Sequence, residues 1–164
     1  MAGARRRGLA IFGLGMASTP HARSLIDLAD RVEVKGAWSR SAERRAAFAG
    51  RFPFPTSGDL DALIGDPEIE VALVLTPPDA RGELVRRLAA AGKHVLTEKP
   101  LERTTPAAEG SVAACEQAGG TLGVVFQTRF RAGAARLRDL IAEGALGTLA
   151  TVQVVLPWWR PQSN

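Results

Sequence analysis

Two glycines directly follow a short apolar run near the N-terminus, where they could bring a phosphate against the backbone. Residues 9–12 are all apolar, as is typical of a strand buried on both faces of a parallel sheet. Gly13 then allows a tight turn, Gly15 has no side chain to keep a ligand away, and an amphipathic stretch begins at His21. A helix N-terminus adds free N–H groups and partial positive charge. This order predicts a site for the pyrophosphate of a dinucleotide, the alternative being a tight turn that binds nothing.

Ser18 takes the third place of this glycine pattern, where Gly or Ala is usual. Its side chain is small enough for close packing, and we expect it to cap the helix that follows. The residues predicted to lie against the pyrophosphate are Gly13, Leu14, Gly15, Met16 and Ala17.

Hydroxyl and guanidinium groups follow the next predicted strand, at residues 32–38. An NAD site usually has an acid about 20 residues past the glycine turn, where it binds the ribose hydroxyls. Ser39 stands at that position, and Arg40 and Arg44 follow. These groups suit the 2′-phosphate of NADP, which an acid would repel, so we expect NADP in preference to NAD. The alternative is a helix cap at Ser41 with solvated arginines, and both can hold together.

A lysine follows a short predicted strand, at Glu98-Lys99-Pro100. Ligands bind at the carboxyl ends of parallel strands, so Lys99 lies on the expected binding edge. Beside a carboxylate and close to a cofactor, its ammonium can donate to a substrate oxygen, while Pro100 restricts the local backbone. The alternative is a surface Glu–Lys pair at the end of a strand.

Predicted strands and helices alternate along residues 9–126. Apolar runs at 9–12, 32–38, 69–75, 95–96 and 122–126 predict strands, and stretches at 21–30, 42–51, 57–65, 79–91 and 105–118 predict helices. The alternation predicts an α/β fold with a doubly wound parallel sheet.

Composition narrows the function classes. The 164 residues suffice for one domain with a real core, and the net charge of +4 is spread along the chain. The cluster at 5–7 is expected to be a solvated tail, so we expect no nucleic-acid partner. Cys115 is the lone cysteine, which predicts neither a disulfide framework nor a metal site. No apolar run suits a signal peptide or approaches the roughly 20 residues of a membrane span, so we expect a cytoplasmic protein without a membrane partner.

Several motifs, taken together, resemble the glucose–fructose oxidoreductase, inositol dehydrogenase and MocA family. They are the glycine turn at 13–17, Thr76-Pro77-Pro78-Asp79, Gly92-Lys93-His94-Val95 and Glu98-Lys99-Pro100, extended by Arg129-Phe130 and the segment 144–147. The resemblance covers nearly the whole chain. It implies a Rossmann-type cofactor domain and hydride transfer between NAD(P) and a sugar, polyol or related hydroxyl or carbonyl compound.

By this resemblance Lys99 is the catalytic lysine, and Glu98 lies at the cofactor. Pro77 packs near the adenine end, and the segment 39–44 lies on the 2′-phosphate. Thr76, Pro78 and Gln127 complete the implied cofactor site. Arg81 stands where family members often have His.

The resemblance also bears on domain organisation, because family members are about twice as long as this chain. We expect residues 1–126 to form the cofactor domain and 127–164 to begin an incomplete second α/β domain, with a helix at 134–143 and a strand at 149–156. The 164-residue chain is then expected to be inactive by itself, and the full-length protein to form homo-oligomers. His21 and His94 are expected to be packing or surface residues. The alternatives are a non-catalytic nucleotide-binding module or subunit, and a fragment that does not fold independently.

Overall fold

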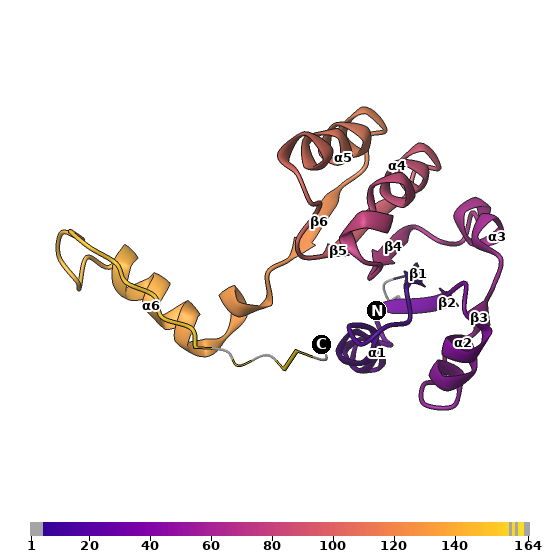
Figure 1. Cartoon of the computed structure of the whole chain (residues 1–164), viewed down its shortest axis with the longest axis horizontal. Coiled ribbons are helices and arrows are strands. Elements are labelled where there is room, and N and C mark those ends of the chain that lie inside the picture. Colours follow the sequence, from indigo (N-terminus) through magenta and orange to yellow (C-terminus); the bar gives the residue numbers. More distant parts are fainter. Residues whose placement is uncertain (1–4, 158, 160, 163–164) are drawn as a thin grey trace. The chain divides into compact units, whose positions relative to one another are not determined.

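The computed structural model describes residues 5–157, 159 and 161–162. The chain divides into two units, Met1–Val125 and Phe126–Asn164. The first unit holds a six-stranded parallel sheet in the order β3-β2-β1-β4-β5-β6 (Figure 1). Its strands are β1 (Arg7–Phe12), β2 (Val32–Trp38), β3 (Thr56–Ser57), β4 (Val71–Val74), β5 (His94–Glu98) and β6 (Leu122–Val125). Its helices are α1 (Ser18–Asp27), α2 (Ala42–Ala49), α3 (Leu60–Gly65), α4 (Gly82–Ala90) and α5 (Thr105–Gln117), with a 3-10 turn η1 (Pro78–Ala80).

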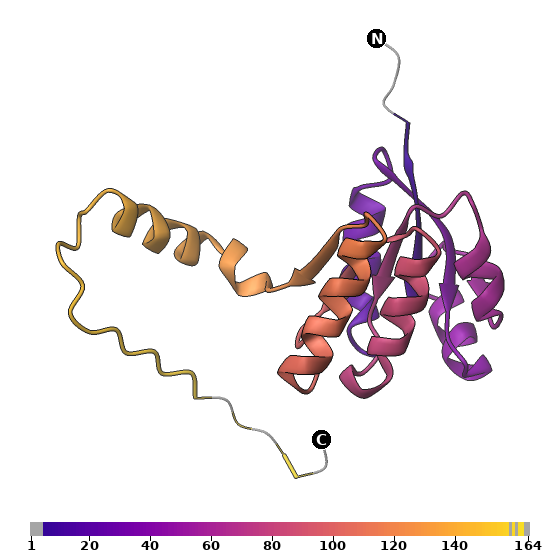
Figure 2. The same ribbon diagram turned by 90° about the horizontal axis from the view of Figure 1, so that it is seen from above.

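Helices cover both faces of the sheet, so the prediction of a doubly wound parallel fold is confirmed (Figures 1 and 2). Strand β1 shows why residues 9–12, which helices cover on both faces, are all apolar. Leu9 and Ile11 pack into the core under α1 and α2, whereas Ala10 and Phe12 pack into the core under α3, α4 and α5. Side chains alternate across a strand, so a central strand with helices on both faces has no polar positions.

The stretch from Thr56 to Gly65 differs from its predicted form. The sequence predicted a helix from Ser57, but Thr56 and Ser57 pair with β2 as the edge strand β3. The helix begins only at Leu60, because the carboxylate of Asp59 accepts a hydrogen bond from the N–H of Ala62 at 2.9 Å. Asp is a strong N-cap residue, and it fixes the boundary between strand and helix.

The second unit is described separately. Its described residues form a 3-10 turn, η2 (Gln127–Phe130), and helix α6 (Ala132–Ala142). The predicted strand at 149–156 is wrong, since those residues adopt no regular structure and side chains such as Val152 and Leu156 are 73% and 82% exposed. A strand needs a hydrogen-bonded neighbour, and β-prone residues do not form one without a partner ladder. No helix in the described part of the chain is long and apolar enough to cross a membrane.

Candidate functional site

The site begins where the strand order reverses. From β1 the chain continues to β2 on one side, while β4 and β5 lie on the other side of β1. The turn after β1 is held by the N–H of Gly13, which donates to the carbonyl of Trp38 at 3.0 Å. Such a point at the carboxyl edge of a doubly wound sheet is where ligands bind.

The two glycines of this turn have different reasons for lacking a side chain. Gly13 has φ +109°, and a Cβ there would lie 2.9 Å from the backbone of Leu75 and Thr76. Gly13 is therefore required by the fold, since the turns after β1 and β4 touch. A Cβ on Gly15 would meet nothing within 4 Å, and Met16 beside it is 95% exposed. The space in front of Gly15 is open, as a pyrophosphate site requires.

Ser18 has a role other than the predicted one. Its hydroxyl donates to the carbonyl of Gly15 at 2.7 Å, and its own N–H donates to the same oxygen at 3.0 Å. The N-cap of α1 is Ala17, which makes no side-chain cap hydrogen bond. The prediction that Ser18 caps the helix is wrong, because Ser18 already lies inside its first turn and holds the glycine turn closed.

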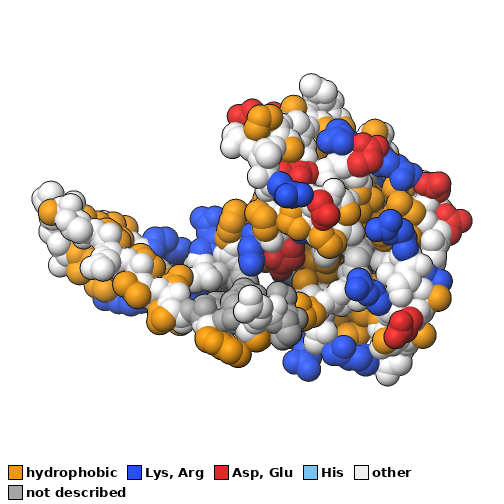
Figure 3. All heavy atoms as spheres, in the orientation of Figure 1, with side chains coloured by type: hydrophobic (Ala, Val, Ile, Leu, Met, Phe, Trp, Pro, Cys, Tyr) orange, Lys and Arg blue, Asp and Glu red, His pale blue; other side chains and the backbone are white. Residues whose placement is uncertain are grey.

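A cavity of about 770 Å³ opens at this edge of the sheet. The predicted cofactor residues that line it are Gly13, Leu14, Gly15, Met16, Ala17, Ser39, Arg40, Arg44, Thr76, Pro77, Glu98 and Lys99. Pro78 begins η1 outside this lining, and Gln127 belongs to the second unit. Further lining residues that the sequence did not single out include Trp38, Leu60, Glu83, Leu84 and Arg87. Figure 3 shows Lys and Arg side chains around a hydrophobic patch on this unit.

The turn after β2 presents two exposed arginines to the cavity, Arg40 and Arg44. The hydroxyl of Ser41 accepts from the N–H of Arg44 at 3.1 Å, so the predicted cap of α2 is confirmed. Arg45 has a role that the sequence did not indicate. Its guanidinium donates to the carbonyls of Ser39 and Arg40, at 2.5 and 3.1 Å, and so fixes the shape of the turn.

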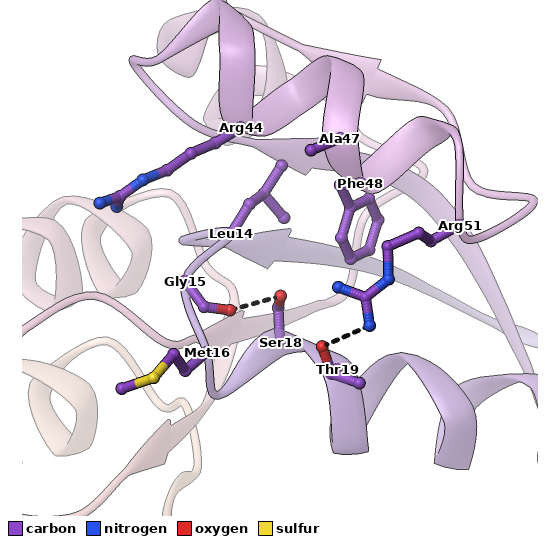
Figure 4. Close-up of a pocket in the computed structure, with 9 residues that line it drawn as sticks. All are labelled: Leu14, Gly15, Met16, Ser18, Thr19, Arg44, Ala47, Phe48 and Arg51. Carbon is purple, nitrogen blue, oxygen red and sulfur yellow. Dashed lines mark hydrogen bonds between the residues drawn. The ribbon is translucent and has the colours of Figure 1, made fainter.

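A smaller cavity of about 450 Å³ lies between α1 and α2 (Figure 4). Its two arginines, Arg44 of α2 and Arg51 just past the end of that helix, point apart. Arg51 donates to the hydroxyl of Thr19 at 3.1 Å, whereas Arg44 extends past Leu14 and also lines the larger cavity. Arg44 is therefore available to a ligand of the larger cavity, and Arg51 is engaged within the protein.

The turn after β5 carries Glu98 and Lys99. One carboxylate oxygen of Glu98 lies 2.8 Å from Nε2 of His21, and the other accepts from the N–H of Lys99 at 3.2 Å. Lys99 is exposed and lines the cavity. His21, expected to be a packing or surface residue, is partly buried and contacts a carboxylate that lines the cavity. His94 has a structural role, with Nδ1 accepting from the N–H of Thr121 at 3.1 Å.

Arg81 is 2% exposed and lies beneath the same turn. Its guanidinium donates to the carbonyls of Thr76 and Glu98, each at 2.5 Å, and to that of Pro100. Burial lowers the pKa of this guanidinium, and the carboxylates of Glu102 and Glu98 oppose that effect. Next to it, the hydroxyl of Thr76 is buried and has no hydrogen-bond partner within the described part of the chain. That hydroxyl belongs to a residue lining the cavity, which fits a site that receives a polar ligand.

The chain matches a known family over most of this unit. The Gfo/Idh/MocA model, described as the oxidoreductase family with an NAD-binding Rossmann fold, matches residues 7–126. The chain belongs to this family. A reductase of Ensifer adhaerens that acts on 1,5-anhydro-D-fructose is 39% identical over 116 residues, which are 70% of this chain and 35% of that protein. The scyllo-inositol 2-dehydrogenase (NADP(+)) of Bacillus subtilis is 29% identical over 153 residues, 93% of this chain and 42% of that protein.

Solved structures give the same picture of this Gfo/Idh/MocA chain. The crystal structure of GenD2 from gentamicin A biosynthesis, in complex with NAD, has a TM-score of 0.81 and 26% identity. The match covers 88% of this chain and 41% of that one. The chain therefore spans less than half the length of the relatives described here.

Proposed function

We propose that the chain binds NADP and forms the cofactor-binding part of an oxidoreductase that acts on a sugar, polyol or related hydroxyl or carbonyl compound. The observation that carries this proposal is a single cavity lined by the glycine turn, by the arginines after β2 and by Lys99 after β5. These groups match, in order, the needs of a pyrophosphate, a 2′-phosphate and a reacting oxygen. The relatives' names, a sugar reductase and an inositol dehydrogenase, support the substrate class.

The choice of NADP rests on the turn after β2. Ser39 stands in place of the acid that binds ribose hydroxyls in NAD sites, and Arg40 and Arg44 are exposed to the cavity. Guanidinium groups form charge-assisted hydrogen bonds with phosphate oxygens. The relatives include a protein named for NADP and a structure that holds NAD, so the chain's own residues carry this part of the proposal.

The proposed role of Lys99 follows from its place. A bound nicotinamide cofactor supplies or accepts the hydride. When a carbonyl is reduced, negative charge develops on its oxygen, and the ammonium of Lys99 can donate a hydrogen bond or a proton to it. In the reverse direction the amine receives the proton from the alcohol. Glu98, held by His21 and by the N–H of Lys99, fixes the start of the turn.

A non-catalytic nucleotide-binding module is the alternative function. It would use the same glycine turn and arginines but would not need a lysine at the mouth of the cavity. The relatives described above are named as a reductase and a dehydrogenase, so this alternative is not favoured.

Titration with NADPH and with NADH, read by the fluorescence of the reduced nicotinamide, tests the proposal. We expect saturable binding of both, with NADPH tighter by about tenfold or more, since charge-assisted hydrogen bonds contribute about 1.5–3 kcal/mol. Absence of binding by either nucleotide would reject the cofactor site. Tighter binding of NADH would reject the assignment of NADP.

A further inference from the structure

Arg81 ties together two segments that carry the site. Its Nη2 donates to the carbonyl of Thr76, just past β4, and its Nη1 donates to the carbonyls of Glu98 and Pro100, at and beyond the end of β5. The side chain itself starts at the N-cap of α4. One buried guanidinium thus joins the turn after β4, the turn after β5 and the start of a helix.

The bonded carbonyls stand on both sides of Lys99. The carbonyl of Glu98 is in the peptide bond directly before Lys99. The carbonyl of Pro100 belongs to the residue directly after Lys99. The N–H of Lys99 is also engaged, since it donates to the Glu98 carboxylate at 3.2 Å. The backbone around Lys99 is therefore fixed, while its side chain is exposed toward the cavity that it lines.

We infer that Arg81 is the positioning residue for Lys99, an inference that rests on the role proposed for Lys99 above. A guanidinium has donors in a rigid planar fork and stays charged, so it can hold carbonyls that arrive from different directions. Hydrogen bonds from a charged donor are about twice as strong as neutral ones, and the more so away from water. Arg81 also lines the cavity, but its Nη1 and Nη2 donate to backbone carbonyls, two of which lie on either side of Lys99.

The far side of the same turn supports this inference. Glu102 packs against the start of α4, where a Cβ on Gly82 would collide with its carboxylate. Glu102 and Glu98 are the carboxylates that favour the charged form of Arg81. The turn is therefore docked on α4 at two places, by hydrogen bonds to Arg81 and by the packing of Glu102 on Gly82.

Removing the guanidinium leaves the carbonyls of Thr76, Glu98 and Pro100 without their donor. The turn after β5 then loses its fixed position, and Lys99 with it. The glycine turn and the arginines after β2 do not bond to Arg81, so binding of the phosphates is expected to persist. The predicted signature is a protein that binds NADPH but whose Lys99 no longer responds to it.

The lysines of the chain make this signature measurable in the full 164-residue protein. Lys35 is ion-paired with Glu33 at 2.9 Å, and Lys93 is buried against the carbonyl of Asp66 at 2.6 Å. Reductive methylation with ¹³C-formaldehyde keeps the positive charge of lysines and gives each a separate methyl signal. The signal missing from Lys99→Arg identifies Lys99.

In the unmodified sequence, saturating NADPH is expected to shift the Lys99 methyl signal. In Arg81→Met we expect NADPH affinity within about threefold of the original, but loss of that shift and at least tenfold faster exchange of the Lys99 amide hydrogen. Arg86→Met is the matched control, since Arg86 lies on the same helix and pairs with Glu83 at 2.9 Å on the surface. It should behave as the original protein does.

The inference is overturned if NADPH shifts the Lys99 methyl signal in Arg81→Met as much as in the original protein. It is also overturned if Arg81→Met loses both this shift and NADPH binding. If Arg81→Met does not fold, Arg81→Lys decides, because lysine keeps the charge but cannot bridge the separated carbonyls. A normal shift of the Lys99 signal in Arg81→Lys then overturns the inference.

A different outcome concerns the proposed function. If NADPH binds the unmodified protein without moving the Lys99 signal, the role of Lys99 fails, whatever Arg81 does.

Discussion

His21 and Glu98 lie 77 residues apart in the sequence, yet Nε2 of the histidine is 2.8 Å from a carboxylate oxygen of the glutamate. His21 stands on α1, the helix that follows the glycine turn, and Glu98 ends β5. Both side chains are less than one-fifth exposed. The contact connects the helix that follows the glycine turn with the strand end that precedes Lys99.

This contact predicts an energetic coupling between two distant elements. His21→Ala leaves a mostly buried carboxylate without its partner, so we expect the free energy of unfolding to fall by about 1–3 kcal/mol. A double-mutant cycle with Glu98→Ala should give a coupling of about 0.5–3 kcal/mol by urea denaturation. His94→Ala, which removes a histidine outside the site, provides the comparison. Additive effects of His21→Ala and Glu98→Ala would mean that the contact contributes nothing to stability.

The open space at Gly15 predicts a variant that folds but does not bind the cofactor. A side chain at Gly15 meets no protein atom within 4 Å of its Cβ, so Gly15→Val should leave the circular dichroism spectrum unchanged. The added side chain occupies the space proposed for the pyrophosphate, and NADPH binding should be lost. Gly110→Val, at a position on α5 that is equally open, controls for the added volume and branching. NADPH affinity that survives in Gly15→Val would remove the glycine turn from the site.

The exposed arginines after β2 predict which cofactor loses affinity. Arg40→Ala or Arg44→Ala removes a group proposed to contact the 2′-phosphate, which should weaken NADPH by about ten- to a hundredfold and leave NADH nearly unchanged. Fluorescence titration of both nucleotides measures the ratio. Arg51→Ala, just past the end of α2 and bonded to Thr19, should leave this ratio as it is. Equal weakening of both nucleotides would show that Arg40 and Arg44 are only solvated.

Lys99 predicts a separation of binding from turnover. In the form of the protein that turns over a sugar or polyol with NADP, Lys99→Met should lower kcat by about 10² or more, as removal of an acid–base group does. The affinity for NADPH should stay within a few-fold, since the residues proposed to hold the phosphates lie elsewhere. Lys35→Met, at a residue that does not line the cavity and is paired with Glu33, is the matched control. A near-normal kcat for Lys99→Met would make Lys99 a surface residue of the turn.

Local patterns in the sequence predicted most of the sheet and much of the site's lining. Val32–Trp38 forms the predicted strand, and Ser41 caps the helix that follows it, as predicted. Period and capping act over a few residues, so they can be recognised without the fold. The rule that ligands bind at the carboxyl ends of parallel strands then placed Gly15, Arg40 and Lys99 together. Their roles toward the cofactor stay predictions.

Hydrogen-bonded pairing with a neighbouring strand decided which segments form strands where local sequence propensity was misleading. Thr56 and Ser57 form a strand because β2 lies beside them, whereas the β-prone residues 149–156 form none among the described residues. The composition of the second stretch favours a strand more than that of the first. Strand formation requires a neighbouring ladder, and its presence is a property of the fold.

The sequence by itself determined the parallel sheet, the glycine turn and the strand ends from which the cavity is lined. Only the tertiary structure decided which charged side chains form hydrogen bonds that hold the turns lining that cavity. Nothing near Arg81 or His21 in the sequence indicates that these side chains contact groups on distant segments. A buried guanidinium is stable only where carbonyls converge on it, and those of Thr76, Glu98 and Pro100 come from separate strand ends. That convergence exists only after the strands have paired.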